Sequence, residues 1–145
     1  LDDLYDACGT DFDLAIDVKG DGAGEVISRV AASRGVAGRL WLFTERTAEH
    51  GSVAAAHRGV SVRGEDLQEP ATRRALLRSL QEQDVEVVNA RWPWWRRAAV
   101  QDVHAAGMLA FAWDVQWSVA VWRCRHLRID GIFSDHVRLL RSSSK

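Results

Sequence analysis

The sequence predicts an α/β fold, an incomplete TIM-type (β/α) barrel that contains only the later strands and helices. Apolar runs of strand length alternate with helical patterns across short loops, which indicates a parallel sheet. Several of these runs end in a polar residue, among them Asp17, Asn89 and Asp135. A parallel barrel carries its chemistry on such residues, at the carboxyl ends of its strands. A closed eight-stranded barrel needs about 250 residues, whereas this chain has 145.

The first half of the chain contains three expected strands and two expected helices. Residues 13–19 alternate between apolar and polar side chains, which is typical of a strand. A helix is expected over 24–33, where three β-branched residues share one face ahead of a glycine. Residues 39–44 form a second apolar run and therefore a second strand. A weakly apolar helix over 45–57 and a short strand over 60–63 complete this half.

The second half continues the alternation. Pro70 suits a first helical turn and predicts a helix over 70–80. A strand over 85–89 follows, then a helix over 94–106 that ends at a glycine, and then the longest strand, over 108–115.

The last elements are a helix over 117–127, a strand over 129–133 and a short helix capped by Asp135. By its length the chain is expected to form a single domain, residues 1–145. Its serine-rich end, 141–145, is expected to be a disordered tail.

Composition narrows the possible partners. The net charge of −1 predicts no nucleic-acid partner. No apolar stretch approaches the roughly 20 residues that a membrane span needs. The chain starts at Leu1 without a basic-then-apolar leader, so the sequence favours the cytoplasm while leaving the compartment open. Cys8 and Cys124 have no CxxC partner and are expected to be reduced and buried.

One compositional bias points to a site. The chain has 17 arginines but only two lysines, Lys19 and the terminal Lys145. Lys19 is therefore the only lysine of the expected folded body, and it lies at the end of the first strand. Lysine is a compact point charge, whereas arginine is a planar fork. The placement of a lysine at position 19 in an arginine-rich chain indicates that a site there requires a compact ammonium. The alternative is that a lysine occurs there by chance.

Four segments together resemble one family of barrel enzymes. Asp-Leu-Ala-Ile-Asp-Val-Lys-Gly at 13–20 is similar to a strand of the type Leu-x-Ile-Glu-x-Lys, and Val-Val-Asn at 87–89 to a strand that ends in asparagine. Phe-Ala-Trp-Asp-Val-Gln at 111–116 resembles Trp-Thr-Val-Asn, and Ile-Asp-Gly-Ile-Phe-Ser-Asp at 129–135 resembles a closing Val-Asp-Gly-Ile-Ile-Thr-Asp. In this order and spacing, the segments resemble the carboxyl-terminal part of the barrel domain of the glycerophosphodiester phosphodiesterases.

This resemblance implies a metal-dependent phosphoric diester hydrolase of lipid and glycerol metabolism. Such an enzyme cleaves a small-molecule glycerophosphodiester to glycerol 3-phosphate and an alcohol. The resemblance implies that Asp17 is one metal ligand and that Lys19, as a catalytic residue, contacts the phosphate. It implies that Asn89 and Trp113 bind the substrate. The expected ion is Mg²⁺ or Ca²⁺, because the ligands are hard oxygens.

The residue chemistry agrees with this assignment. Asp17 and Lys19 are two residues apart on a strand, so their side chains share a face. A carboxylate beside an ammonium suits a site where a divalent cation meets a phosphate. A plain ion pair inside the barrel is the alternative for these two residues. Core packing is the alternative for Trp113, and loop capping is the alternative for Asn89.

The chain also departs from the family pattern. An opening His-Arg-Gly followed by a Glu-x-Asp pair, which would supply the other ligands and an acid/base histidine, is not found. His57-Arg58-Gly59 matches the first of these motifs, but strands precede it and Gly-Glu-Asp follows it, so we interpret the match as a coincidence. The chain alone is therefore expected to be inactive or nearly so.

Three tryptophans and their arginine neighbours, in residues 91–97, could form a lip that touches lipid. Helix packing with solvated arginines is the interpretation we prefer.

Two other functions remain open. The chain could be a non-catalytic barrel remnant or interaction module that self-associates through an open barrel edge. It could also be a different phosphate-handling barrel enzyme, such as an isomerase.

Overall fold

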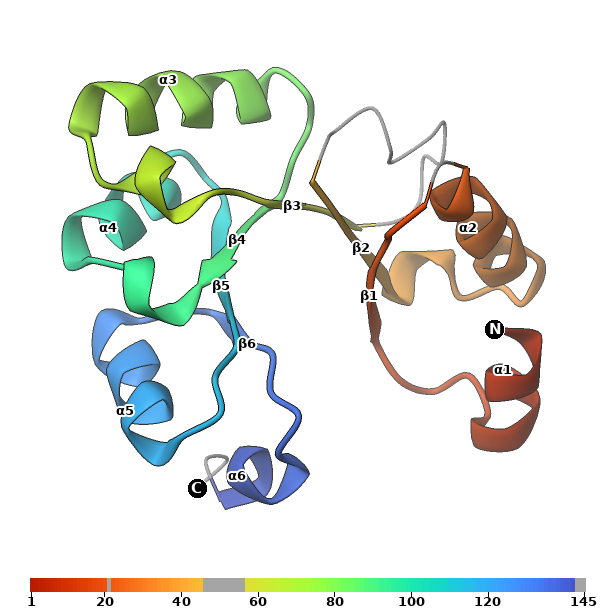
Figure 1. Cartoon of the computed structure of the whole chain (residues 1–145). Helices are drawn as coiled ribbons and strands as arrows, with labels where there is room; N and C mark the ends of the chain where they lie inside the picture. Colours follow the sequence, from red (N-terminus) through yellow and green to blue (C-terminus); the bar gives the residue numbers. More distant parts are fainter. Residues whose placement is uncertain (21, 46–56, 143–145) are drawn as a thin grey trace. The chain divides into compact units, whose positions relative to one another are not determined.

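The computed structural model describes residues 1–20, 22–45 and 57–142. The chain divides into two compact units, Leu1–Ser61 and Val62–Lys145. Each unit contains three parallel strands in chain order, and helices lie in the connections that the structure describes (Figure 1). The predicted α/β class is therefore confirmed. No helix of the described residues is long and apolar enough to cross a membrane.

The first unit is built on three short strands. Strand β1 pairs in parallel with β2, and β2 pairs in parallel with β3. Its elements are α1 (Asp2–Cys8), β1 (Leu14–Asp17), α2 (Ala23–Ser33), η1 (Ala37–Arg39), β2 (Leu40–Thr44) and β3 (His57–Ser61).

One face of these strands packs against α2. Leu40 and Leu42 of β2 lie in a buried cluster with Ala31 of α2, and Leu14 and Ile16 of β1 pack against that cluster. Because side chains alternate along a strand, Asp17 lies on the other face of β1. The apolar pattern that forms the core thus also directs the polar residue away from it.

Helix α1 is an element that the sequence analysis did not predict. Its Tyr5 is buried in the first unit's core and stacks with Phe12 at a centroid distance of 5.9 Å. Arg34, at the end of α2, holds the helix from outside through Asp2 and Asp6, at 2.8 and 2.6 Å. Two carboxylates one turn apart therefore clamp one guanidinium.

The second unit repeats the strand–helix pattern. Helices α3, α4 and α5 lie along one side of strands β4, β5 and β6 (Figure 1). Its elements are η3 (Gly64–Leu67), α3 (Pro70–Gln81), β4 (Val87–Arg91), η4 (Trp92–Trp94), α4 (Arg97–Ala105), β5 (Leu109–Trp113), α5 (Ser118–Leu127), β6 (Gly131–Ile132) and α6 (Val137–Ser142).

The two faces of this second sheet have different compositions. Small apolar residues, such as Ala90 and Ala112, are fully buried. The opposite face of the same strands carries Asn89 in register with Phe111, and Arg91 in register with Trp113. The functional residues predicted on β4 and β5 therefore share one face.

Polar contacts hold the helices of this unit in place. The Glu69 carboxylate accepts hydrogen bonds from the amides of Ala71 and Thr72, which caps α3 and lowers the pKa of Glu69. The buried Arg73 of α3 pairs with Asp102 of α4 at 2.6 Å. These contacts fix the first turn of α3 and its spacing from α4.

Several predicted boundaries are corrected. The strand predicted over 60–63 is β3, which begins at His57; the helix predicted over 45–57 lies largely outside the described residues. The strand predicted to extend to 115 ends at Trp113, because Asp114 takes a left-handed backbone conformation with φ of 62°. The predicted tail lies outside the described residues except for its first two residues, which end α6.

The two cysteines differ, contrary to prediction. Cys124 is buried on α5 as predicted, and burial raises its pKa to about 11. Cys8 at the end of α1 is exposed, so its predicted burial is wrong. The reason is that α1 buries its other face through Tyr5.

We expect one thiol per native chain to react quickly with a disulfide reagent at pH 8. At that pH the Cys124 thiol, with a pKa of about 11, is almost entirely protonated as well as buried, and the thiolate is the reactive form. The second thiol should react only after denaturant is added. The fast reaction should disappear in Cys8→Ser and persist in Cys124→Ser. Two fast thiols in the native chain, or a fast reaction that disappears only in Cys124→Ser, would contradict this assignment.

Candidate functional site

The first unit brings the predicted pair Asp17 and Lys19 into direct contact. Lys19 Nζ lies 2.7 Å from Asp17 Oδ2, and the two side chains are 67% and 51% exposed. Lys19 Nζ also lies 3.9 Å from Oε1 of Glu45, which follows β2. One ammonium therefore lies between carboxylates from the ends of two neighbouring strands, as expected where parallel strands finish at one edge.

Glu45 is a member of this group that the sequence analysis missed. It directly follows the strand β2, whose Phe43 is in register with Asp17. Glu45 could have been found because it is a polar residue at the end of an apolar strand, the same pattern that indicated Asp17. The sequence analysis instead assigned Glu45 to the start of the helix predicted over 45–57.

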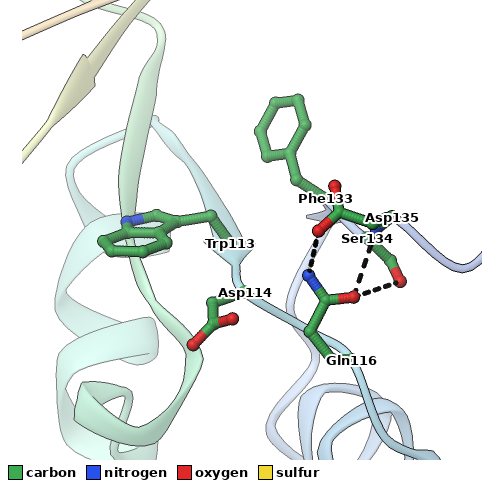
Figure 2. A pocket seen from close by; sticks show the side chains of 6 residues that line it. All are labelled: Trp113, Asp114, Gln116, Phe133, Ser134 and Asp135. Carbon is green, nitrogen blue, oxygen red and sulfur yellow. Dashed lines mark hydrogen bonds between the residues drawn. The ribbon is translucent and has the colours of Figure 1, made fainter.

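The second unit contains an open pocket at the ends of β5 and β6. The pocket has a volume of about 430 Å³, and Figure 2 shows the side chains around it. Its lining residues are Trp113, Asp114, Gln116, Phe133, Ser134 and Asp135. An apolar wall with a few converging polar groups is the composition of a small-molecule site.

Gln116 organises the polar side of this pocket. Its Nε2 donates to Asp135 Oδ2 at 2.7 Å, and its Oε1 accepts from Ser134 Oγ at 3.3 Å and from the Asp135 amide at 3.2 Å (Figure 2). A single amide side chain from the loop after β5 therefore holds the loop after β6. Neither Gln116 nor Ser134 was predicted as a site residue.

The other side of the pocket carries a paired charge. Asp114 Oδ2 accepts from Arg91 Nε at 2.7 Å and lies 2.6 Å from Arg91 Nη2. The Arg91 guanidinium also lies 5.9 Å from the centroid of the Trp113 ring, within reach of a cation–π interaction. Arg91 was missed, although its position two residues after Asn89 on one strand could have indicated it.

The two residues predicted to bind substrate occupy different positions. Trp113 lines the pocket and is 41% exposed, so it does not have the core-packing role considered as its alternative. Asn89 is 5% exposed within β4 and is not a lining residue of the pocket. It lies within the strand, in register with Phe111, so it is not a loop cap.

Asp135 does not cap α6 as predicted. The helix begins at Val137, so His136 is the residue that precedes it. The Asp135 carboxylate instead accepts the hydrogen bond from Gln116. Asp135 therefore bonds to Gln116 on another loop instead of capping the helix that follows it.

The other sequence features that resembled functional motifs have structural roles. His57-Arg58-Gly59 lies in β3, where the ring of Phe43 would be 2.5 Å from a Cβ at Gly59. Of the clustered tryptophans, Trp95 is fully buried and donates to the carbonyl of Phe111 at 3.0 Å. Trp94 lies against Gly64. Packing, the preferred interpretation of that cluster, therefore holds for these two.

The oxygen donors near Lys19 are too few for a divalent cation. Asp17 and Glu45 offer hard oxygens, but Ca²⁺ takes six to eight oxygen ligands, and the ammonium of Lys19 contacts Asp17. No group of three or more His, Cys, Asp or Glu side chains in the described part of the chain is arranged to hold a metal ion. These residues do not form a metal site by themselves.

Comparison with solved structures places the fold in the (β/α) barrel class. The chain is similar to a protein of Galdieria sulphuraria assigned to the glycerophosphodiester phosphodiesterases, with a TM-score of 0.80 and 14% identity over 99% of this chain and 63% of that one. It is also similar to a glycerophosphodiester phosphodiesterase of Parabacteroides distasonis, with a TM-score of 0.65 and 10% identity over 89% of this chain and 55% of that one.

A third similar structure holds a ligand. It is an Oleispira antarctica phosphodiesterase in complex with its product sn-glycerol-3-phosphate, with a TM-score of 0.65 and 17% identity over 90% of this chain and 54% of that one. No model of a protein family matches the sequence, and no curated protein matches it.

These likenesses confirm the predicted incomplete barrel. The chain spans between 54% and 63% of the length of these three structures. At 10–17% identity they establish the fold, and the resemblance drawn from sequence motifs agrees with it.

We expect Lys19→Ala to lower the free energy of unfolding by no more than about 1 kcal/mol, because exposed ion pairs contribute about that much or less. Both partners are more than half exposed, at 67% and 51%. Urea denaturation of wild type, Lys19→Ala and Asp17→Ala measures this. A loss of several kcal/mol would instead give the pair a structural role.

Proposed function

We propose that this chain is the later part of a glycerophosphodiester phosphodiesterase, a metal-dependent phosphoric diester hydrolase. The observation that carries the proposal is the coincidence of two independent features. The fold matches solved phosphodiesterases with TM-scores up to 0.80. The polar side chains that the sequence motifs single out lie at or near the carboxyl ends of parallel strands, where barrel enzymes have their sites.

In this proposal Lys19 contacts the phosphate of the substrate. Its ammonium is 67% exposed and lies beside Asp17. A compact cation at this position can stabilise negative charge that develops on phosphoryl oxygens during hydrolysis. The neighbouring carboxylates of Asp17 and Glu45 hold the ammonium in place.

Asp17 is proposed as one oxygen ligand of a Mg²⁺ or Ca²⁺ ion. The other ligands would come from outside the described residues, because these offer too few. When bound, such an ion polarises a phosphoryl oxygen and lowers the pKa of a nucleophile. The aspartate is one methylene shorter than the glutamate of the family motif, which shortens its reach.

The second unit is proposed to hold the glycerol portion or the leaving group. Trp113 provides an apolar wall, and Gln116 with Ser134 provides hydrogen-bonding groups at the pocket. Arg91 adds a cation beside Trp113. Asn89 lies on the same face, two register positions deeper in the sheet, and would contact ligand groups that extend to that depth.

We expect the purified 145-residue chain to release no glycerol 3-phosphate from glycerophosphocholine, with or without Mg²⁺ or Ca²⁺. An opening His-Arg-Gly motif followed by a Glu-x-Asp pair, which would supply further ligands and the acid/base group, is not found in it. Coupled detection of glycerol 3-phosphate measures this. Release that a chelator abolishes would show that the chain is active, and would contradict this expectation.

Binding tests the site without requiring turnover. Isothermal titration with sn-glycerol 3-phosphate should give an affinity that Lys19→Ala weakens about tenfold or more, since hydrogen bonds to charged groups contribute about 1.5–3 kcal/mol. Arg29→Ala is the matched control, because Arg29 is also an exposed cation paired with a carboxylate, at 2.9 Å from Glu25. Equal loss in both variants, or no binding by wild type, would overturn the assignment of Lys19.

A non-catalytic remnant that self-associates is the second candidate. Strands β1 and β6 are the ends of the strand order, and the backbone of such an edge is a template for pairing. If this function holds, sedimentation velocity should show a concentration-dependent dimer. A monomer at every concentration tested would rule it out.

A different barrel enzyme, such as an isomerase, has no observation in its favour.

A further inference from the structure

Helix α5 exposes large apolar side chains on its outer face. Val119 is 63% exposed and Trp122 is 65% exposed, and Trp117, which precedes the helix, is 55% exposed. Val119 and Trp122 are three residues apart and therefore lie on one face of the helix. We call Trp117, Val119 and Trp122 the α5 aromatic face.

Packing of the hydrophobic core does not explain these exposed apolar side chains. The core-facing side of α5 is already apolar and buried through Ala120, Val121 and Cys124. A surface helix of a globular protein normally has a polar outer face opposite such an apolar stripe. α5 instead carries apolar residues on both faces, and a second tryptophan of this unit, Trp95, shows how fully the fold can bury that side chain.

A chain of contacts joins this face to positive charge. The ring of Trp122 stacks on His126 at a centroid distance of 5.4 Å and an interplanar angle of 9°. Arg97 Nη2 of α4 lies 3.2 Å from His126 Nε2. Among the described residues no carboxylate forms an ion pair with Arg97. An exposed guanidinium is therefore held at the edge of the aromatic face without an internal counter-ion.

The surrounding sequence has the same charge. Residues 115–129 contain three arginines, one histidine and no aspartate or glutamate, although the whole chain has a net charge of −1. Positive charge is thus concentrated on the part of the chain that exposes the tryptophans. A partner that is negatively charged at its surface and apolar beneath it would complement both properties.

We propose that the α5 aromatic face docks on the surface of an anionic phospholipid bilayer. Tryptophan prefers the boundary between head groups and acyl chains, because its ring is apolar and its N–H is polar. The Arg97 guanidinium would pair with lipid phosphate as Trp122 enters the boundary. None of the described helices crosses the bilayer in this arrangement.

A second protein surface fits the face less well. A stable protein–protein interface buries about 800 Å² on each partner, from some 20–30 residues. The α5 aromatic face has three large apolar side chains beside the Arg97 guanidinium, and two identical copies would bring like charges together. A bilayer needs only a few inserted side chains and supplies the opposite charge.

Co-sedimentation of the full chain with vesicles tests the proposal. One vesicle preparation contains phosphatidylcholine alone, and the other contains phosphatidylcholine mixed with phosphatidylserine. The chain should sediment with the mixed vesicles and much less with the neutral ones. Arg97→Glu should weaken this binding about fivefold or more, since one cation near an anionic membrane contributes about 1 kcal/mol.

Trp122→Ala should weaken it about tenfold, because a buried large apolar side chain contributes about 1.5–3 kcal/mol. Two controls match these variants. Val26→Ala truncates a side chain that is 57% exposed on α2, and Arg78→Glu reverses an exposed charge on α3; both should bind as wild type. Far-UV circular dichroism and urea unfolding check that each variant is folded.

Equal sedimentation with neutral and mixed vesicles, or unchanged binding by Trp122→Ala and Arg97→Glu, would overturn the proposal. So would the absence of any vesicle binding together with a dimer that Trp122→Ala dissociates, which would make the face an interface between copies. The measurement needs no catalytic activity and does not involve Lys19. Its failure is therefore distinct from failure of the phosphodiesterase assignment.

Discussion

The two-residue period of the parallel strands is the constraint on which the rest of this structure depends. In the first unit it packs the partly buried Ile16 against the core cluster that includes Ala31 of α2, and it turns Asp17 to the opposite face. In the second unit it buries Ala90 and places Asn89 in register with Phe111 across the sheet. A register slip of one residue would exchange the two faces and expose the core. The same burial that stabilises each unit therefore directs its polar residues toward one face.

Charge is used differently in different parts of the molecule. Arg73 is buried and reaches Asp102 at 2.6 Å and the carbonyl of Leu67 at 2.7 Å, so removing one partner would leave a buried charge uncompensated. The pair of Asp17 and Lys19 is exposed and contributes little to stability. An exposed pair of this kind can exchange its internal partner for a ligand at small cost. The burial of an ion pair, rather than the distance between its charged atoms, therefore distinguishes a structural pair from one that is available to a ligand.

The element order followed from local patterns, and the exceptions have physical causes. All six strands of the described residues and the helices over 24–33, 70–80 and 117–127 were predicted, because each has an apolar period that matches its type. The start of β3 was missed because Gly59 weakens a strand pattern, and its reason for being glycine is the Phe43 ring on the neighbouring strand. Helix α1 was missed because its burial rests on Tyr5 alone.

The sequence by itself determined that polar residues lie near the ends of the strands and that Asp17 and Lys19 are close enough along the chain to share a face. These relations depend on neighbours within one strand or on the shared end of parallel strands. Only the tertiary structure decided that Glu45 approaches Lys19 and that Gln116 joins the loops after β5 and β6. Such contacts join side chains from separate loops, whose conformations no periodic pattern encodes. Long-range packing, not local propensity, sets them.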